Sequence, residues 1–438
     1  MSPIMLLGLM TLLMLVLIAT EMPIAFAVGL AGGLGIVLLM GWGTLLYTVG
    51  TFPSSRIASF SWSAIPLYIL LGNLAAASGV ATDAYDMANK WFGRMRGGLV
   101  MPTIIASGLI AATTGIGATS IAVLGKVAVP EMEKRGYDRS LSCGATASCG
   151  PLGMLIPPST SFVVIGILAE LSIGKLFMAG ILPGILTVAV FMTMVWIRCR
   201  INPNLAPLGD KYSWKERIRS LSKSWGVIVL FFVVIGGLYS GIATATEVAA
   251  IGCFVAFIMA ILAIINKKTT WKAIGFSVKD TIRVSAMVFG FIIGAGIFSL
   301  FITISSVIPD LLVQMNSLTL SPYIILVIIL IVYLILGLFF DPMSMVMVTV
   351  PVFFPLVVDG LGVDPIWFAV ITVIMVEISA LTPPVGLSLY MMKAVYPIAT
   401  LGEIIRGCMP FVGANLVVVA ILFFFPQIAT WLPSLMYH

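Results

Sequence analysis

Charged residues are scarce in this 438-residue sequence: Asp, Glu, Lys and Arg make up 9% of it, against 61% hydrophobic residues. That leaves too little polar surface to cover a soluble globule of this size, which excludes a soluble protein. Histidine is scarcer still, because His438 is the only one, and this excludes a metal site built on imidazole. With no histidine cluster and no paired nucleophile and base, the sequence also argues against an enzyme.

Cysteine is the next shortage. The five cysteines lie in apolar segments without any CxxC spacing: Cys143, Cys149, Cys199, Cys253 and Cys408. The alternatives, a disulfide or a metal ligand, have no spacing to support them. We therefore expect small apolar core residues.

Long apolar runs are abundant. Segments of about 20 apolar residues recur along the chain, while the alternating ten-residue segments of a membrane barrel are lacking. The sequence therefore predicts an all-α polytopic membrane protein. The first run has no basic segment before it, so we expect it to stay as a helix and not to be a cleaved signal. The expected spans are 3–20, 23–42, 64–80, 100–133, 141–170, 175–197, 225–243, 246–265, 284–306, 323–357, 365–396 and 408–428.

Two of these spans contain a Pro-Pro pair, in "GMLIPPSTS" at 153–161 and "SALTPPVGLS" at 379–388. A proline inside a helix costs about 3 kcal/mol. Broken backbone survives in a membrane only where protein or a water-filled cavity satisfies it, and freed carbonyls are good ligands for a hard cation. The doubled pattern therefore predicts ion sites, with a kink of no function as the alternative. Hydroxyls flank both breaks: Ser159, Thr160, Ser161, Ser379, Thr382 and Ser388.

Two further spans, 100–133 and 323–357, are too long for one crossing. They are interrupted by "TTGIGATS" at 113–120 and by "GLFFDPMS" at 337–344, which predicts two re-entrant hairpins. Asp341 is an acid in an apolar setting, which makes it a functional candidate. Its alternative role is a helix cap that binds backbone N–H groups.

The positive charges predict the topology, because cytoplasmic loops carry the excess of Lys and Arg. Twenty of the 23 basic residues share one face if each long segment returns to the side from which it entered. The first hairpin then opens to the cytoplasm and the second to the outside, and both termini lie outside. The twenty lie in groups at 90–96, 134–139, 198–223 and 267–283, with Lys393 and Arg406.

The two halves also match at a constant offset of 226 positions. Asp138 in "GYD" corresponds to Asp364 in "GVD", and Pro157 corresponds to Pro383. Each half is thus a re-entrant hairpin followed by a Pro-broken helix, and the second half is inverted. Inverted repeats with interrupted helices are typical of secondary transporters, whose sites lie at the midplane where the breaks meet.

The segments at 127–184 and 337–386 resemble the large, DctM-type membrane subunit of tripartite ATP-independent periplasmic (TRAP) transporters, of the ion transporter superfamily. The resemblance covers nearly the whole chain and implies a sodium-driven elevator with a transport domain and a scaffold. The transport domain would comprise 98–170 and 321–396. The scaffold would comprise 1–97 and 171–320, with a C-terminal helix in 397–438.

The resemblance also implies the sites. The first sodium site would use Thr114, Gly115, Gly117, Ser120, Gly153, Ile156 and Pro158. The second would use Gly337, Asp341, Ser379, Thr382 and Val385. The substrate would lie among Thr119, Ser120, Pro158, Ser159, Asp341, Pro384 and Val385. One departure affects the first site, because many relatives have a serine-rich "SGSS" tip where this chain reads "TGIGATS".

The implied function is sodium-coupled import of an organic acid, such as a C4-dicarboxylate, a sialic acid or a 2-oxo acid. Two or more sodium ions would be needed, and no organic cofactor. The implied partners are a periplasmic solute-binding protein and a small four-helix membrane subunit, expected as a separate chain. The location would be the bacterial inner membrane, with periplasmic termini. The alternatives are a self-sufficient sodium/dicarboxylate or citrate carrier, and a channel.

Overall fold

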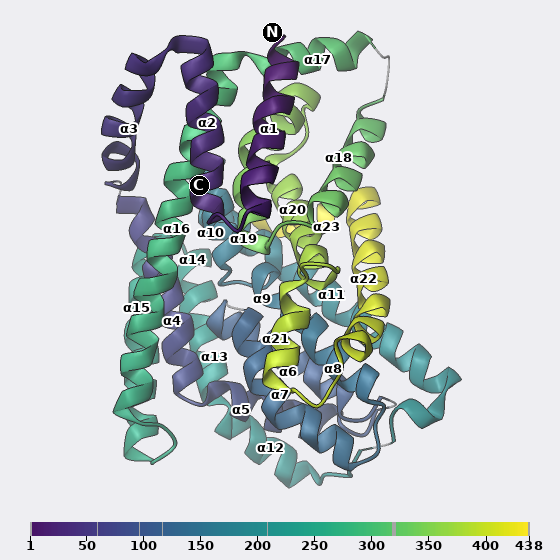
Figure 1. Cartoon of the computed structure of the whole chain (residues 1–438). Coiled ribbons are helices and arrows are strands. Elements are labelled where there is room, and N and C mark those ends of the chain that lie inside the picture. Colours follow the sequence, from purple (N-terminus) through teal and green to yellow (C-terminus); the bar gives the residue numbers. More distant parts are fainter. Residues whose placement is uncertain are drawn as a thin grey trace.

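The computed structural model describes residues 2–436 except 59, 96, 116, 208 and 318–320. Within these ranges every regular element is a helix, which confirms the all-α prediction (Figure 1). Five of the described helices are long and apolar enough to cross a membrane, or up to eight if each bent pair is one span. The chain thus has the helices of a multi-pass membrane protein.

The helices follow the predicted order. The N-terminal group is α1 (Pro3–Ala19), α2 (Ile24–Met40), α3 (Trp42–Ile57), α4 (Ala64–Ala77) and α5 (Val80–Phe92). The first hairpin and broken helix are α6 (Val100–Thr114), α7 (Gly117–Lys134), α8 (Arg139–Cys149), α9 (Leu152–Leu155) and α10 (Thr160–Leu168). The middle group is α11 (Ile173–Ile201), α12 (Trp214–Lys223), α13 (Trp225–Phe231), α14 (Gly237–Tyr239), α15 (Ala245–Ile265), α16 (Trp271–Ser305) and α17 (Val307–Ser317). The second hairpin, the second broken helix and the end are α18 (Pro322–Leu336), α19 (Pro342–Phe354), α20 (Pro365–Leu381), α21 (Leu387–Val395), α22 (Leu401–Phe424) and α23 (Gln427–Ser434).

Both Pro-Pro segments interrupt their helices, as predicted. The first break separates α9 from α10, and the helices on its two sides are bent by 41°. The second separates α20 from α21, and the Pro157–Pro158 and Pro383–Pro384 peptide bonds are both cis. Figure 1 shows α6 and α7 in the lower half of the molecule and α18 and α19 in the upper half, with α9 between them. The two hairpins therefore reach toward the centre from opposite ends.

Two helices begin at least seven residues earlier than predicted. α16 begins at Trp271 and not at 284, so most of the expected loop 267–283 is helical. Ile274, Ser277 and Thr281 repeat at helical spacing and are buried against α4, while the basic residues stand on the opposite face. Because of those basic residues, the sequence suggested a cytoplasmic loop here and not the first turns of a membrane helix. The last long helix, α22, begins at Leu401 and not at 408, because a capping box between Thr400 and Glu403 starts it.

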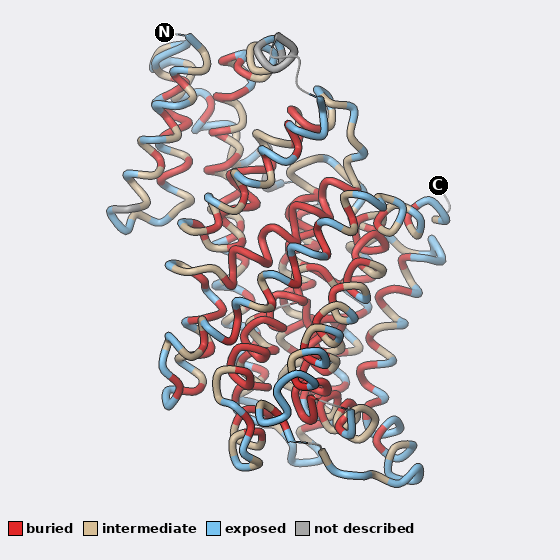
Figure 2. The backbone as a smooth tube through the Cα atoms, turned by 90° about the vertical axis from the view of Figure 1, so that its right-hand side faces the viewer, coloured by how far each residue is buried: buried red, intermediate tan, exposed pale blue. Residues whose placement is uncertain are grey.

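The distribution of buried residues fits a protein surrounded by lipid. Buried residues fill the centre of the molecule and exposed ones lie around it (Figure 2). Large apolar side chains are exposed along one stripe of α18, formed by Ile324, Val327, Ile328, Ile331 and Ile335. Inside, small residues let helices approach closely: a Cβ on Gly32 of α2 would lie 2.6 Å from the Cα of Phe298 in α16. All five cysteines are free and buried, as expected of small core residues.

The two segments that precede the broken helices have the same local structure. Gly136 and Gly362 both have positive φ angles, of 78° and 67°. Two residues later an aspartate caps the next helix: Asp138 accepts a hydrogen bond from the Leu141 backbone N–H at 2.8 Å, and Asp364 from that of Trp367 at 2.9 Å. The matched "GYD" and "GVD" sequences thus form matched helix starts.

We expect Asp138→Ala and Asp364→Ala each to lower the free energy of unfolding by about 1 kcal/mol, because each change leaves a helix N-terminus without its cap. Thermal unfolding in detergent would measure this. Asp359→Ala is the matched control, since that carboxylate is exposed. A loss no larger than in the control would show that the caps do not stabilise α8 and α20.

Candidate functional site

A cavity of about 360 Å³ lies where the two hairpin tips and the two breaks meet. Four elements of the predicted transport domain line it: the first tip with Gly115 and Gly117, the first break with Thr160 and Ser161, the second tip with Asp341 to Met343, and the second break with Ala380, Leu387 and Ser388. Segments more than 200 residues apart in the sequence therefore share one chamber.

The opposite wall comes from two helices outside those segments. α4 contributes Ile65, Tyr68 and Ile69, and α16 contributes Asp280, Val284 and Val288. These two helices pack against each other, and the Asn73 side-chain amide in α4 donates to the Asp280 carboxylate at 3.2 Å. The cavity thus lies between two bodies, the hairpins with the broken helices on one side and α4 with α16 on the other.

The first tip contacts the first break directly. Gly115, with φ +62°, ends α6, and a Cβ there would collide with the Pro158 carbonyl oxygen. The Thr160 hydroxyl donates to the Gly115 carbonyl at 3.5 Å. Ser120 is fully buried, and its hydroxyl has no partner among the described residues. The backbones of Gly115 and Pro158, both in the predicted first sodium site, thus lie against each other.

The other members of that predicted set surround the same contact. The Thr114 hydroxyl donates to the Ile110 carbonyl at 2.9 Å, and a Cβ on Gly117 would collide with the Gly150 carbonyl. Gly153 begins the turn that leads into the break, its N–H donating to the Gly150 carbonyl at 3.1 Å. The side chain of Ile156 lies against Gly184 of α11. Because this side chain is a hydrocarbon, only the backbone carbonyl of Ile156 could bind an ion.

The second tip contacts the second break in a similar way. A Cβ on Gly337 would lie 2.7 Å from the Cβ of Ser379. The Ser379 hydroxyl donates to the Val376 carbonyl and the Thr382 hydroxyl to the Ile378 carbonyl, both at 2.7 Å. Each hydroxyl oxygen keeps lone pairs that can face a cation. Val385 lies in the break itself and is half-buried.

Asp341 is the N-cap of α19. Its carboxylate accepts hydrogen bonds from the backbone N–H groups of Met343 at 3.1 Å and Ser344 at 3.2 Å, and from the Ser344 hydroxyl. The structure therefore shows the helix-cap role that the sequence offered as the alternative. The same residue also lines the cavity, so the cap places a negative charge on the cavity wall.

Of the predicted substrate residues, Asp341 lies on the cavity wall. The wall does not include Thr119, Ser120, Pro158, Ser159, Pro384 or Val385. Ser159 is buried as the cap of α10, where its hydroxyl donates to the Met154 carbonyl and accepts from the Phe162 N–H. The serine and threonine residues that line the cavity are instead Thr160, Ser161 and Ser388.

The sequence did not predict that α4 and α16 line the cavity. Asp280 fell in an expected cytoplasmic loop, although it belongs to α16. The signal that could have found it is the spacing of Ser277, Asp280, Val284 and Val288, which places all four on one helical face. Asn73 in α4 is its polar counterpart, and its amide also donates to the Thr281 hydroxyl at 3.1 Å.

Four helix N-termini meet at the cavity, those of α7, α10, α19 and α21. A helix N-terminus carries a partial positive charge and free N–H groups, which favour an anion. The described lining contains no lysine or arginine, and its carboxylates are those of Asp280 and Asp341.

Glu377, the other acid deep in an apolar segment, does not line the cavity. It lies in α20 with 1% of its surface exposed, and its Oε1 atom has no partner among the described residues.

The chain matches the family described as "Tripartite ATP-independent periplasmic transporter, DctM component" over residues 11–428. It is 33% identical to the C4-dicarboxylate TRAP transporter large permease protein DctM of Pseudomonas aeruginosa, covering 93% of this chain and 94% of that relative. It is 31% identical to the isethionate TRAP transporter permease protein DctMQ of Oleidesulfovibrio alaskensis, over 93% of this chain and 63% of that longer relative. The sialic acid TRAP transporter large permease protein SiaM of Vibrio cholerae is 29% identical, over 86% of this chain and 87% of that relative.

Two solved structures have a similar fold. The Alcanivorax borkumensis YdaH transporter has a TM-score of 0.64 at 16% identity and covers 90% of each chain. Neisseria gonorrhoeae MtrF has a TM-score of 0.59 at 13% identity, over 89% of this chain and 85% of that one. At these identities the similarity supports the fold alone.

Proposed function

Because this chain belongs to the DctM component family of TRAP transporters, we propose that it is the large permease subunit of a sodium-coupled importer for an organic acid. The acid is a C4-dicarboxylate, a sialic acid or a related carboxylate. A periplasmic binding protein delivers it, and a small membrane subunit completes the transporter. The observation that carries the proposal is the cavity shared by both hairpin tips and both breaks.

The lining of the cavity supports an anionic substrate. Four helix N-termini point their positive ends to it, and Thr160, Ser161 and Ser388 supply hydroxyl donors for carboxylate oxygens. The relatives described above are named for a C4-dicarboxylate, isethionate and sialic acid, which are all anions.

The contacts between tips and breaks support sodium as the coupling ion. Each hairpin tip packs against its helix break, and carbonyl and hydroxyl oxygens lie at the junction. The described cavity lining has no lysine or arginine. Hard cations prefer oxygen ligands of this kind. Sodium at the first junction would use the buried Ser120 hydroxyl and the carbonyls of Gly115 and Pro158. Sodium at the second would use the Ser379 and Thr382 hydroxyls with backbone oxygens near Gly337.

The two walls of the cavity support an elevator. The hairpins and broken helices, 98–170 and 321–396, form one wall and move as the transport domain, while α4 and α16 belong to the scaffold. Hairpins that approach from opposite ends and helix starts matched at Asp138 and Asp364 support an inverted repeat. Such a repeat gives two related positions of the domain, one facing each side of the membrane.

Uptake into vesicles that contain the whole transporter tests the coupling. With a tenfold inward sodium gradient, we expect substrate to accumulate about tenfold more per coupled ion than with equal sodium on both sides, since each ion contributes about 1.4 kcal/mol. Replacing sodium with potassium should remove this accumulation. Accumulation that is unchanged in potassium would overturn sodium coupling.

Omitting the binding protein distinguishes the alternative carrier. In the TRAP mechanism, uptake should fall to the background of empty vesicles when the binding protein is left out. Full sodium-driven uptake without it would favour a self-sufficient carrier. A continuous ohmic current in a planar bilayer would favour a channel. Candidate acids can be screened first by the rise they cause in the melting temperature of the binding protein.

A further inference from the structure

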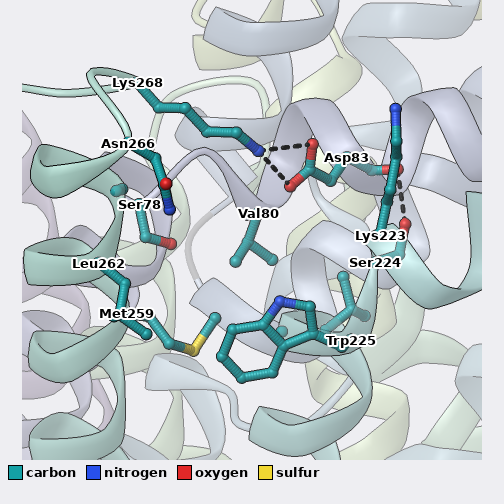
Figure 3. A pocket seen from close by; sticks show the side chains of 13 residues that line it. Ser78, Val80, Asp83, Lys223, Ser224, Trp225, Met259, Leu262, Asn266 and Lys268 are labelled. Carbon is teal, nitrogen blue, oxygen red and sulfur yellow. Dashed lines mark hydrogen bonds and ion pairs between the residues drawn. The ribbon is translucent and has the colours of Figure 1, made fainter.

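A second, smaller pocket of about 70 Å³ lies on the side of the molecule that carries most of the basic residues. It forms where α4 meets α5, where α12 meets α13, and where α15 ends (Figure 3). Its floor is apolar, with Val80, Val227 and Met259 buried there. Its rim is charged, with Asp83, Lys223 and Lys268. An apolar floor below a charged rim suits an amphipathic ligand.

The backbone fixes both lysines at this rim. After the end of α15, Lys267 has a φ of 58° and the Lys268 N–H donates to the Ala263 carbonyl at 2.8 Å, so the chain turns back at the pocket. On the other side the buried Ser224 hydroxyl donates to the Asp83 carbonyl at 2.8 Å, which holds the α12–α13 corner against α5.

The rim of the pocket has more positive than negative side chains, with two lysines and one aspartate. The Lys268 ammonium group lies 3.2 Å from Oδ2 and 3.4 Å from Oδ1 of Asp83. Lys223 forms no ion pair within the described part of the chain, and Figure 3 shows its ammonium group above and to the right of the paired Lys268 and Asp83. The two lysines and the one aspartate of the rim therefore carry one net positive charge, which a negatively charged ligand would balance.

An apolar path leads from the pocket along the membrane-spanning helices. Trp225 and Leu262 line the pocket and are 45% and 40% exposed. Ile228 in α13 and Ile258 in α15 continue this exposed surface, and the two helices pack side by side. The exposed apolar surface thus continues from the pocket along α13 and α15, on the side where acyl chains would lie.

α12 has the form of a helix that lies in a membrane interface. It is bent by 52° from the helix that follows. Trp214, Ile218 and Leu221 are exposed at helical spacing on one face, and basic residues flank them. Since α12 ends at Lys223, this helix places the pocket at headgroup level.

We propose that this pocket binds the phosphodiester headgroup of an anionic phospholipid from the cytoplasmic leaflet. Lys223 and Lys268 hold the phosphate, and the acyl chains follow the exposed surface of α13 and α15. Basic pockets between helices on the cytoplasmic side are typical sites for such headgroups. The bound lipid joins α5, the α12–α13 corner and α15, and thereby stabilises the scaffold. The proposal does not depend on the substrate or on sodium coupling.

The test is thermal unfolding of the purified full-length chain in detergent, titrated with short-chain phosphatidylglycerol or short-chain phosphatidylcholine. We expect phosphatidylglycerol to raise the melting temperature at lower concentrations than phosphatidylcholine. Lys223→Gln with Lys268→Gln should weaken the apparent affinity for phosphatidylglycerol by about 25-fold, roughly fivefold per lysine. Lys211→Gln with Lys215→Gln is the control, because both lysines are exposed and the change in charge is the same.

Asp83→Asn gives an effect of the opposite sign. It removes the carboxylate that competes for Lys268, so phosphatidylglycerol should bind about fivefold more tightly. This gain cannot come from a variant that merely folds poorly. Equal stabilisation by phosphatidylcholine would overturn a charge-selective site, and equal stabilisation by inorganic phosphate would overturn a lipid ligand. A pocket double variant that behaves like the control would also overturn the proposal.

Discussion

Gly115→Ala is expected to lower sodium-dependent uptake by at least about 100-fold. The added methyl group collides with backbone, and moving the backbone apart would cost about 3 kcal/mol. The new methyl group would overlap the Pro158 carbonyl oxygen and push the first hairpin tip off the first break. Carbonyls from both sides would then no longer point at one ion. Uptake by reconstituted transporter measures the loss, and the rise in melting temperature in sodium over potassium measures binding directly on this chain.

The control for this change is Gly136→Ala. Gly136 also has a positive φ, of 78°, so alanine is strained there as well, but a Cβ at that position meets nothing within 4 Å. We expect this variant to lose some stability and to keep its sodium response. If Gly115→Ala kept both uptake and the sodium response, the junction of the first tip and first break would not be the ion site.

Gly72→Ala is expected to slow uptake by about 30-fold, because a collision of about 2 kcal/mol shifts a two-state equilibrium by that factor. Gly72 is in α4, and a Cβ there would collide with the Thr114 carbonyl at the first tip. This contact joins scaffold to transport domain, so it should exist in only one position of an elevator. The change would then disfavour the position seen here.

The position of the domain can be followed with Ser388→Cys, which places a thiol in the cavity. The rate at which a thiol reagent added outside labels this cysteine is measured. The five native cysteines are buried and stay in place. We expect Gly72→Ala to change that rate by about tenfold or more. Gly275→Ala is the control, since it is also in a scaffold helix and meets nothing within 4 Å. Slower uptake with an unchanged labelling rate would argue against a domain that moves past α4.

Features that depend on local chemistry could be predicted from the sequence. Both helix breaks follow from paired prolines, the first tip from glycines at 115 and 117, and the matched helix starts from Gly136 with Asp138 and their counterparts. Each of these residues restricts or frees the backbone where it stands. Their placement therefore needed no knowledge of packing.

The walls of the cavity could not be predicted in the same way. Tyr68 and Asp280 reach it because α4 packs against both α16 and the first hairpin, which is a long-range arrangement. Ser159 and Thr160 are neighbours, yet one caps α10 inside the protein and the other lines the cavity. Only the orientation of α10 decides between them. Sequence position near a break therefore does not decide which side chains line the cavity.

The charges on the cavity wall have a consequence for energetics. With two carboxylates and neither ammonium nor guanidinium in the described lining, a bare dianion would be repelled, and the proposed sodium ions would serve as its counter-charge. Two such ions would balance a dianionic substrate, so that a full transport cycle would move no net charge. A third would add one net positive charge, worth about 2.3 kcal/mol per 100 mV of membrane potential. The number of ions held at the two junctions thereby decides whether the membrane voltage drives accumulation.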